Sequence, residues 1–234
     1  MKVYVYSEKG KTKEICEDAA LINREIFSDT YYVCDMNETS CIVALADGVG
    51  GNAGGGCASR YVLEKMKELP MSGISKEILK KLIVEINRDL LQYSLNRQHQ
   101  NKMATTMTGI IAASEGMFIF HVGNTRLYLL QGNYLKQLTE DHTTYQWLIN
   151  RGQFESAQEC NKNEIIYCMG GGNEKFADGI WVEENTSVKT GKRILMTTDG
   201  IHEYLSIDQL EEFIVGDISE KKMRQLAEKA GLRV

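Results

Sequence analysis

An aspartate followed by glycine ends two separate apolar runs of this 234-residue chain. In "CIVALADGVGGNAGGG" (41–56), Asp47 is followed by six glycines within nine residues. In "RILMTTDG" (193–200), the run ends at Asp199 and Gly200. A tight turn explains either pair alone, because Asp-Gly is a common turn dipeptide and glycine accepts a positive φ. Strands that each deliver a carboxylate to a point of close backbone approach would instead form a site for an ion or a phosphate.

A third acidic position strengthens the second interpretation. In "KEICEDAAL" (13–21), the adjacent Glu17 and Asp18 stand at the start of another apolar run. Hard divalent cations such as Mg²⁺ and Mn²⁺ bind carboxylate oxygens, carbonyl oxygens and water. A carboxylate can bridge two ions, and a glycine after it lets its own carbonyl face one of them. The three positions together therefore predict a cation site better than three unrelated turns do.

The elements that must position these acids can be predicted from hydrophobic spacing. Runs rich in β-branched or aromatic residues predict strands at 2–6, 18–23, 31–35, 41–46, 106–113, 116–122, 125–130, 133–137, 178–184 and 192–197. Helical spacing predicts helices from 55 to near Pro70 and at 75–93, 141–151, 206–213 and 219–230. The close succession of strands between 106 and 137 indicates an antiparallel meander. Strands and helices come in blocks, which is typical of an α+β fold whose sheets are covered by helices.

Composition favours one domain over residues 1–234, because 43% of the residues are hydrophobic and no Pro-, Gly- or Ser-rich segment separates two halves. The net charge of -5 gives no electrostatic reason to expect nucleic acid or an anionic membrane as a partner.

Cysteine and histidine usage points to a cytoplasmic protein without a zinc site. The six cysteines include no C-x-x-C pair and no zinc-ligand spacing, and the four histidines never fall four residues apart. The first residues lack the apolar core of a signal peptide, and no window approaches the roughly 20 apolar residues that span a bilayer. We therefore expect free thiols in a reducing cytoplasm.

Five blocks of the sequence resemble the metal-dependent serine/threonine protein phosphatases of type 2C, the PPM family, in their bacterial form. They occur in the family's order and cover nearly the whole chain. The blocks are "CEDAAL" (16–21), "ALADGVGGNAGGGCAS" (44–59), "MATTMTGIIAA" (103–113), "FHVGNTRLYLLQGNYLKQLTEDHT" (120–143) and "ILMTTDGIHEYLS" (194–206).

The resemblance implies a four-layer αββα sandwich, with two antiparallel sheets packed together and helices on both outer faces. It also implies a site for two Mn²⁺ or Mg²⁺ ions between the sheets. Asp47 would bridge both ions, the Gly48 carbonyl would bind one of them and Asp199 the other. Glu17 and Asp18 would bind the ions through water molecules or orient the metal-bound waters. The implied reaction is hydrolysis of phosphoserine or phosphothreonine in a protein substrate by a metal-activated water, with no covalent enzyme intermediate. The oligomeric state is left open.

Two positions of the site depart from the family pattern. Lys13 stands where the family has an arginine that binds the substrate phosphate, so it would act as a point charge without the bidentate fork. Asn124, in "GNTR" (123–126), stands where the family has an acid that helps to bind a third ion, so a third ion is not expected.

Two further expectations concern the end of the chain and the segment from about 150 to 178. The family ends on an Asp-Asn-x-Thr strand whose aspartate completes one metal position, whereas this sequence stops at "EKAGLRV" (228–234). One ion is therefore expected to bind weakly, and the alternative function is a catalytically weak or inactive pseudophosphatase that binds phosphoproteins or regulates a partner. The segment from about 150 to 178 is the part least like the family and is expected to select substrates.

Overall fold

The computed structural model describes residues 1–11, 13–36, 40–49, 54–96, 103–113, 116–172, 176–185, 188 and 191–231. In chain order the elements are β1 (Lys2–Ser7), β2 (Ala19–Ile22), β3 (Glu25–Phe27), β4 (Thr30–Asp35), β5 (Cys41–Ala46), β6 (Gly48–Val49), α1 (Gly54–Met66), α2 (Lys76–Leu95), β7 (Ala104–Thr105), β8 (Met107–Ala113), β9 (Gly116–Val122), β10 (Arg126–Gln131), β11 (Tyr134–Gln137), α3 (Thr144–Asn150), α4 (Phe154–Glu159), β12 (Met169–Gly170), α5 (Phe176–Gly179), β13 (Trp181–Glu184), β14 (Ile194–Thr197), α6 (Asp199–His202), α7 (Ile207–Val215) and α8 (Glu220–Gly231).

The central element is a six-stranded sheet with the order β13-β9-β8-β5-β2-β3, in which all neighbours are antiparallel. Successive side chains of a strand point to opposite faces, and here both faces are covered. On β8, Met107 and Ile111 belong to the core under the helices, whereas Ile110 belongs to a core on the opposite face. This explains why the strand reads as a continuous apolar run in the sequence.

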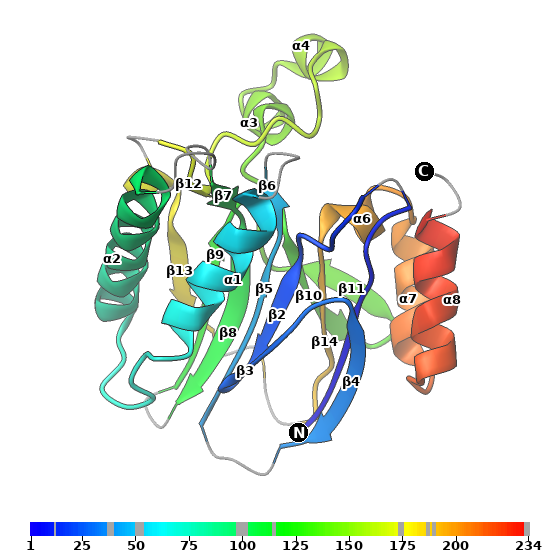
Figure 1. Ribbon diagram of the computed structural model, residues 1–234. Helices are drawn as coiled ribbons and strands as arrows, with labels where there is room; N and C mark the ends of the chain where they lie inside the picture. The colour runs from blue at the N-terminus through cyan, green and yellow to red at the C-terminus, as the bar shows by residue number, and fades with distance from the viewer. Residues whose placement is uncertain are drawn as a thin grey trace.

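Helices α1 and α2 cover one face of this sheet, as the left side of Figure 1 shows. Their buried stripes include Val62, Leu63, Ile83 and Leu90, which pack into the largest core cluster of the molecule. The Ser75 side chain accepts a hydrogen bond from the backbone N–H of Ile78, which caps the first turn of α2.

The other face of the six-stranded sheet packs on a second layer of strands. This layer contains the pair β1-β4 and the three-stranded sheet β11-β10-β14. One contact cluster joins Ile110 and Ile119 to Leu127 of β10, and another joins Val5 of β1 to Ala20 of β2. Helices α7 and α8 lie outside the second layer, on the right of Figure 1, and pack on β10 and β11 through a fourth apolar cluster. The fold is therefore the expected α+β sandwich of four layers.

The structure corrects several details of the expectation. The second layer consists of two separately hydrogen-bonded sheets rather than one, and a small sheet β12-β7-β6 lies at the edge of the sandwich. The strand expected at 178–184 begins only at Trp181, because α5 occupies the residues before it. The short elements β3, β6, β7, α4 and α6 were not expected, since a few residues carry too little periodicity to reveal them.

The structure also describes the state of the cysteines and the apolar character of the helices. All six cysteines lie in the described part of the chain, and none of them forms a disulfide. Within the described residues, no helix has the length and apolar character needed to cross a membrane.

Candidate metal centre

The register of two neighbouring strands brings two acidic positions together. Strands β2 and β5 are antiparallel, and Ala19 pairs with Ala46. The residue before β2 is Asp18 and the residue after β5 is Asp47, so both lie at the same edge of the six-stranded sheet. The pairing of β2 with β5 therefore places the main chain of both acids at one edge of the sheet.

The third aspartate comes from the second layer. Asp199 is the first residue of α6, directly after β14 and the N-cap residue Thr198. The Thr198 hydroxyl donates to the Asp18 carboxylate over 2.9 Å, which ties the end of β14 to the start of β2. The two acids from different layers are thus joined through one threonine.

Threonine hydroxyls also fix the main chain at Asp47. The Asp47 carbonyl accepts from the Thr106 N–H at 2.9 Å and from the Thr105 hydroxyl at 2.8 Å. The Asp47 N–H donates to the Thr106 hydroxyl at 3.1 Å, and that hydroxyl lies 2.6 Å from the hydroxyl of Thr125 in the second layer. Because both main-chain groups of Asp47 are bonded, its side chain leaves the sheet from a fixed position.

Burial and neighbouring charges change the pKa values of Asp18 and Asp47. The pKa of Asp18 is raised to about 6, mainly by burial and also by the charges of Asp199 and Glu17, against the opposing hydrogen bonds with Thr198 and Asp47. Burial also raises the pKa of Asp47 well above its ordinary value, with added contributions from the charges of Asp18 and Asp199 and from hydrogen bonds to both. The charges of Asp18 and Asp199 therefore both act on the Asp47 carboxylate.

Glycine at two positions creates the close backbone approach that the sequence suggested. A Cβ on Gly48 would collide with the backbone of Gly55 in α1. A Cβ on Gly55 would lie 2.7 Å from Glu17 Oε1 and 2.9 Å from the Gly48 carbonyl oxygen. The carboxylate of Glu17 and the carbonyl of Gly48 therefore face one small space that only a glycine leaves open. Glycines 50 and 51 of the same stretch lie outside the described residues.

This space fits a hard divalent cation. Glu17 is 9% exposed, and its Oε1 atom is buried without a hydrogen-bond partner, which is costly for a carboxylate. A cation would interact favourably with this oxygen and would offset the repulsion among the aspartates. Among the described residues, no three His, Cys, Asp or Glu side chains are placed to hold one ion by themselves. Carbonyl oxygens and water would therefore complete the coordination, as is usual for Mg²⁺.

Lys13 lies at the rim of the carboxylate group. Its ammonium donates to Glu17 Oε2 at 2.6 Å, and its side chain is 49% exposed. The hydrogen bond to Glu17 raises the pKa of Lys13, and the charges of Asp47 and Asp18 add to the effect. An ammonium has three donors, so Lys13 can contact an anion while it remains bonded to Glu17.

The protein phosphatase 2C family matches residues 16–229 of the sequence. The chain belongs to the protein phosphatase 2C family. It is 31% identical over 208 residues to the serine/threonine phosphatase stp of Listeria monocytogenes serotype 4b (strain F2365), which covers 85% of this chain and 79% of that protein. It is 28% identical over 192 residues to the serine/threonine protein phosphatase PstP of Mycobacterium tuberculosis (strain ATCC 25618 / H37Rv), covering 78% of this chain and 36% of that protein.

Solved structures share this phosphatase 2C fold. The crystal structure of the Mycobacterium tuberculosis phosphatase PstP/Ppp superposes with a TM-score of 0.78 at 23% identity and covers 99% of this chain and 92% of that chain. The structure of PppA from Pseudomonas aeruginosa superposes with a TM-score of 0.75 at 19% identity, over 100% of this chain and 91% of that chain. The four-layer arrangement of this chain is thus the arrangement of the family.

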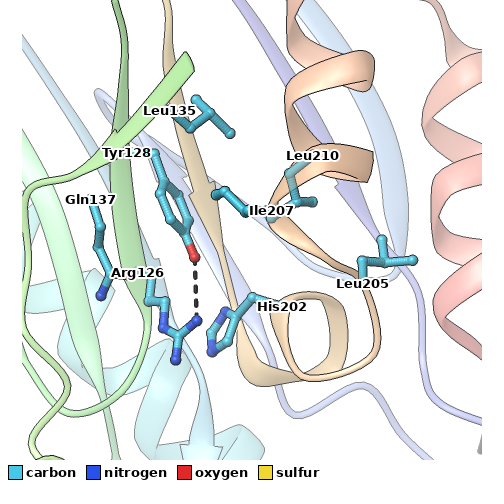
Figure 2. Close-up of a pocket in the computed structure, with 8 residues that line it drawn as sticks. All are labelled: Arg126, Tyr128, Leu135, Gln137, His202, Leu205, Ile207 and Leu210. Carbon is cyan, nitrogen blue, oxygen red and sulfur yellow. Dashed lines mark hydrogen bonds between the residues drawn. The ribbon is translucent and has the colours of Figure 1, made fainter.

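A separate pocket of this phosphatase 2C domain lies beyond the opposite end of α6 from Asp199. It has a volume of about 350 Å³. Figure 2 shows its lining of Arg126, Tyr128, Leu135, Gln137, His202, Leu205, Ile207 and Leu210. The Arg126 guanidinium is bonded to the Asp141 carboxylate at 2.6–3.0 Å, and burial lowers the pKa of His202 to about 3. With its arginine paired and its histidine neutral, this pocket offers less to a cation than the carboxylates do.

All six residues predicted for the site in this family member, namely Lys13, Glu17, Asp18, Asp47, Gly48 and Asp199, lie together in one network of contacts. The prediction missed the threonines that hold them. It interpreted Asn124 only as the replacement of a third-ion ligand and missed that its amide donates to the Asp199 carboxylate over 3.3 Å. The doubled threonines before Asp199 and in "ATTMT" (104–108) are the only signals in the sequence for these contacts.

Proposed function

We propose that this chain removes phosphate from phosphoserine and phosphothreonine in proteins by metal-assisted hydrolysis. The observation that carries the proposal is the group of three partly buried aspartates delivered by three strand ends: β2 and β5 pair next to Asp18 and Asp47, and the hydroxyl of Thr198, the residue before Asp199, donates to Asp18. The phosphatase stp of Listeria monocytogenes, which aligns with 85% of this chain, is named a serine/threonine phosphatase, which supports the same reaction class.

Mn²⁺ or Mg²⁺ is the proposed cofactor, and two bound ions would supply Lewis acidity and a water activated for attack on phosphorus. Asp47 is proposed to be shared by the two positions, because the charges of both Asp18 and Asp199 act on its carboxylate. The Gly48 carbonyl is proposed as a ligand on one side and Asp199 on the other. This assignment gives each ion a carboxylate while leaving room for water and substrate.

The residues around these ligands have separate proposed roles. Glu17 and Asp18 accept hydrogen bonds from water at the site and hold it in orientation, a role supported by the unpartnered Oε1 atom of Glu17. Lys13 attracts the phosphate dianion through its half-exposed ammonium, which the hydrogen bond to Glu17 keeps beside the carboxylates. The cysteines take no part, since a water is the nucleophile.

The experiment is a phosphatase assay with the purified chain, using p-nitrophenyl phosphate and a phosphothreonine peptide across a Mn²⁺ titration. Hydrolysis should rise with Mn²⁺ and stop in EDTA, and Asp47→Asn should lower kcat at least a hundredfold because it removes the shared charged ligand. The exposed Asp208→Asn in the first turn of α7 is the matched control and should retain wild-type activity. Hydrolysis by both proteins at the same rate, well above the rate without protein, would show that the site is assigned wrongly. No hydrolysis by wild type above the rate without protein, with retained phosphopeptide binding, would instead favour an inactive domain.

A further inference from the structure

Asn124 is a buried amide in direct contact with one of the proposed metal ligands. Its side-chain NH₂ donates to Asp199 Oδ2 at 3.3 Å, and the residue is 3% exposed. Its own Oδ1 atom is buried and has no hydrogen-bond partner. A buried amide oxygen without a partner costs stability, typically about 1–3 kcal/mol. An aliphatic side chain would avoid this cost, so packing alone does not account for an asparagine here.

The backbone that carries Asn124 is fixed on both sides. Gly123 has a φ of +111°, and a Cβ there would lie 2.5 Å from the Thr106 side chain. The backbone of His142 donates to the Gly123 carbonyl at 2.8 Å, and the Gly123 N–H donates to His142 Nδ1 at 3.1 Å. Thr125, the next residue, is bonded through its hydroxyl to Thr106. The turn therefore delivers the Asn124 amide to one place.

Asp199 has few other restraints on its side chain. It is the first residue of α6, a helix of one turn. None of the ion pairs between described residues includes its carboxylate. The charges of Asp47 and Asp199 repel each other when both groups are ionised. The Asn124 amide is a neutral donor to the Asp199 carboxylate. It can hold one carboxylate oxygen in place and leave the negative charge of Asp199 available to a metal ion. A lysine or arginine at this position would neutralise that charge.

We propose that Asn124 is a positioning residue for Asp199. Its amide fixes Asp199 Oδ2 and so directs the other carboxylate oxygen toward Asp47 and a shared cation. The proposal rests on the metal site proposed above. It differs from a packing role in requiring the hydrogen-bond donor of the amide and not only its volume.

The test compares three variants by calorimetric titration with Mn²⁺ and by thermal melting in EDTA. Asn124→Ala removes the donor and should weaken Mn²⁺ affinity by about 10- to 100-fold, the usual effect of losing a partner of a metal ligand. Asn150→Ala is the matched control, because that amide also donates to a carboxylate, Glu140, but on the exposed surface of α3. It should bind Mn²⁺ as wild type does.

Asn124→Asp keeps the volume of the side chain, loses the donor and adds a charge beside Asp199. At pH 7.5 in EDTA its melting temperature should be lower than that of Asn124→Ala. Added Mn²⁺ should reduce the difference between the two melting temperatures. If volume were all that mattered, the isosteric aspartate would melt above the alanine. Melting of Asn124→Asp above Asn124→Ala in EDTA, or Mn²⁺ affinity of Asn124→Ala within twofold of wild type, would overturn the proposal. A wild-type chain that binds no Mn²⁺ would contradict the metal site itself, while the EDTA melts would still report on the Asn124–Asp199 contact.

Discussion

At the scale of single residues, the site combines charges that repel one another with a backbone that leaves room for an ion. Burial, together with the charges of Asp18 and Asp199, raises the pKa of Asp47. Beside them, Gly55 lies against the Glu17 carboxylate and the Gly48 carbonyl. The glycine is in a helix, where alanine is normally favoured by about 1 kcal/mol, so its presence reflects the space it leaves.

Gly55→Ala is predicted to impair metal binding. The new Cβ would lie 2.7 Å from Glu17 Oε1 and 2.9 Å from the Gly48 carbonyl, closer than real Cβ contacts, so those groups must move. Mn²⁺ affinity, measured by calorimetric titration, should fall at least tenfold.

Gly54→Ala provides the control in the same helix. A Cβ there would meet Met103 at an ordinary 3.6 Å, so Mn²⁺ binding should stay within twofold of wild type. Equal Mn²⁺ affinity for Gly55→Ala and Gly54→Ala would contradict the view that the Gly55 position borders the ion.

The sequence predicted the charged residues of the site but not their polar partners. Asp47 and Asp199 could be found because each ends an apolar run and precedes glycine. Thr198 could not, because its contact to Asp18 joins residues 180 positions apart in different layers. Such a contact depends on how the two sheets pack, which hydrophobic periodicity does not specify.

At the scale of elements, the pairing of β2 with β5 and the position of α6 after β14 place the acids at one edge of the sandwich. Long elements with strong periodicity, such as α2 and β8, could be predicted within a few residues. Two-residue strands such as β6 and β7 exist only because their partners are present, so no local pattern reveals them. The division of the second layer into two sheets likewise depends on pairing between distant segments.

Helices α3 and α4 project from the sandwich (Figure 1). Each carries an exposed aromatic side chain. Trp147 is 42% exposed and carries the Arg151 guanidinium 3.9 Å from its ring centre, and Phe154 is 60% exposed. The amide of Asn163 in this segment donates to the Glu203 carboxylate at the end of α6. That residues from about 150 to 178 select substrates stays a prediction, and we extend it to α3.

Trp147→Ala and Phe154→Ala are predicted to raise KM for a phosphothreonine peptide several-fold while leaving kcat unchanged. The aromatic surfaces would contact residues that flank the phosphate, and p-nitrophenyl phosphate has none, so its hydrolysis should not change. Tyr134→Ala, at a still more exposed aromatic residue on the β10–β11 hairpin, is the control. Parallel losses on both substrates would indicate that α3 and α4 support the site rather than the peptide.

At the scale of the whole molecule, four apolar clusters stabilise the packed layers, and the acidic residues lie at one edge of these layers. Burial and neighbouring charges raise the folded-state pKa of Asp18 to about 6 and that of Asp47 well above its ordinary value. A raised carboxyl pKa adds stability below the ordinary pKa near 4, and this stability is lost as the pH rises through the folded value. Without metal, these two groups therefore favour folding less at pH 7.5 than at pH 5.

The melting temperature in saturating Mn²⁺ minus that in EDTA is predicted to grow from pH 5 to pH 7.5, by at least about 5 °C. The buried histidines, whose pKa values burial lowers, are present in both conditions and cancel in the difference. Asp47→Asn should flatten the dependence, since it removes one titrating ligand. A difference that is constant between pH 5 and pH 7.5 would argue against ion binding at these carboxylates.

Anomalous diffraction from crystals of the chain soaked in millimolar Mn²⁺ tests the central claim most directly. The account predicts manganese peaks in coordination contact with Asp47, one of them also contacting the Gly48 carbonyl and the other Asp199. The Asp47→Asn crystal should lose both peaks or show them strongly reduced. Manganese bound only elsewhere on the molecule, or peaks of equal height in wild type and Asp47→Asn, would contradict it.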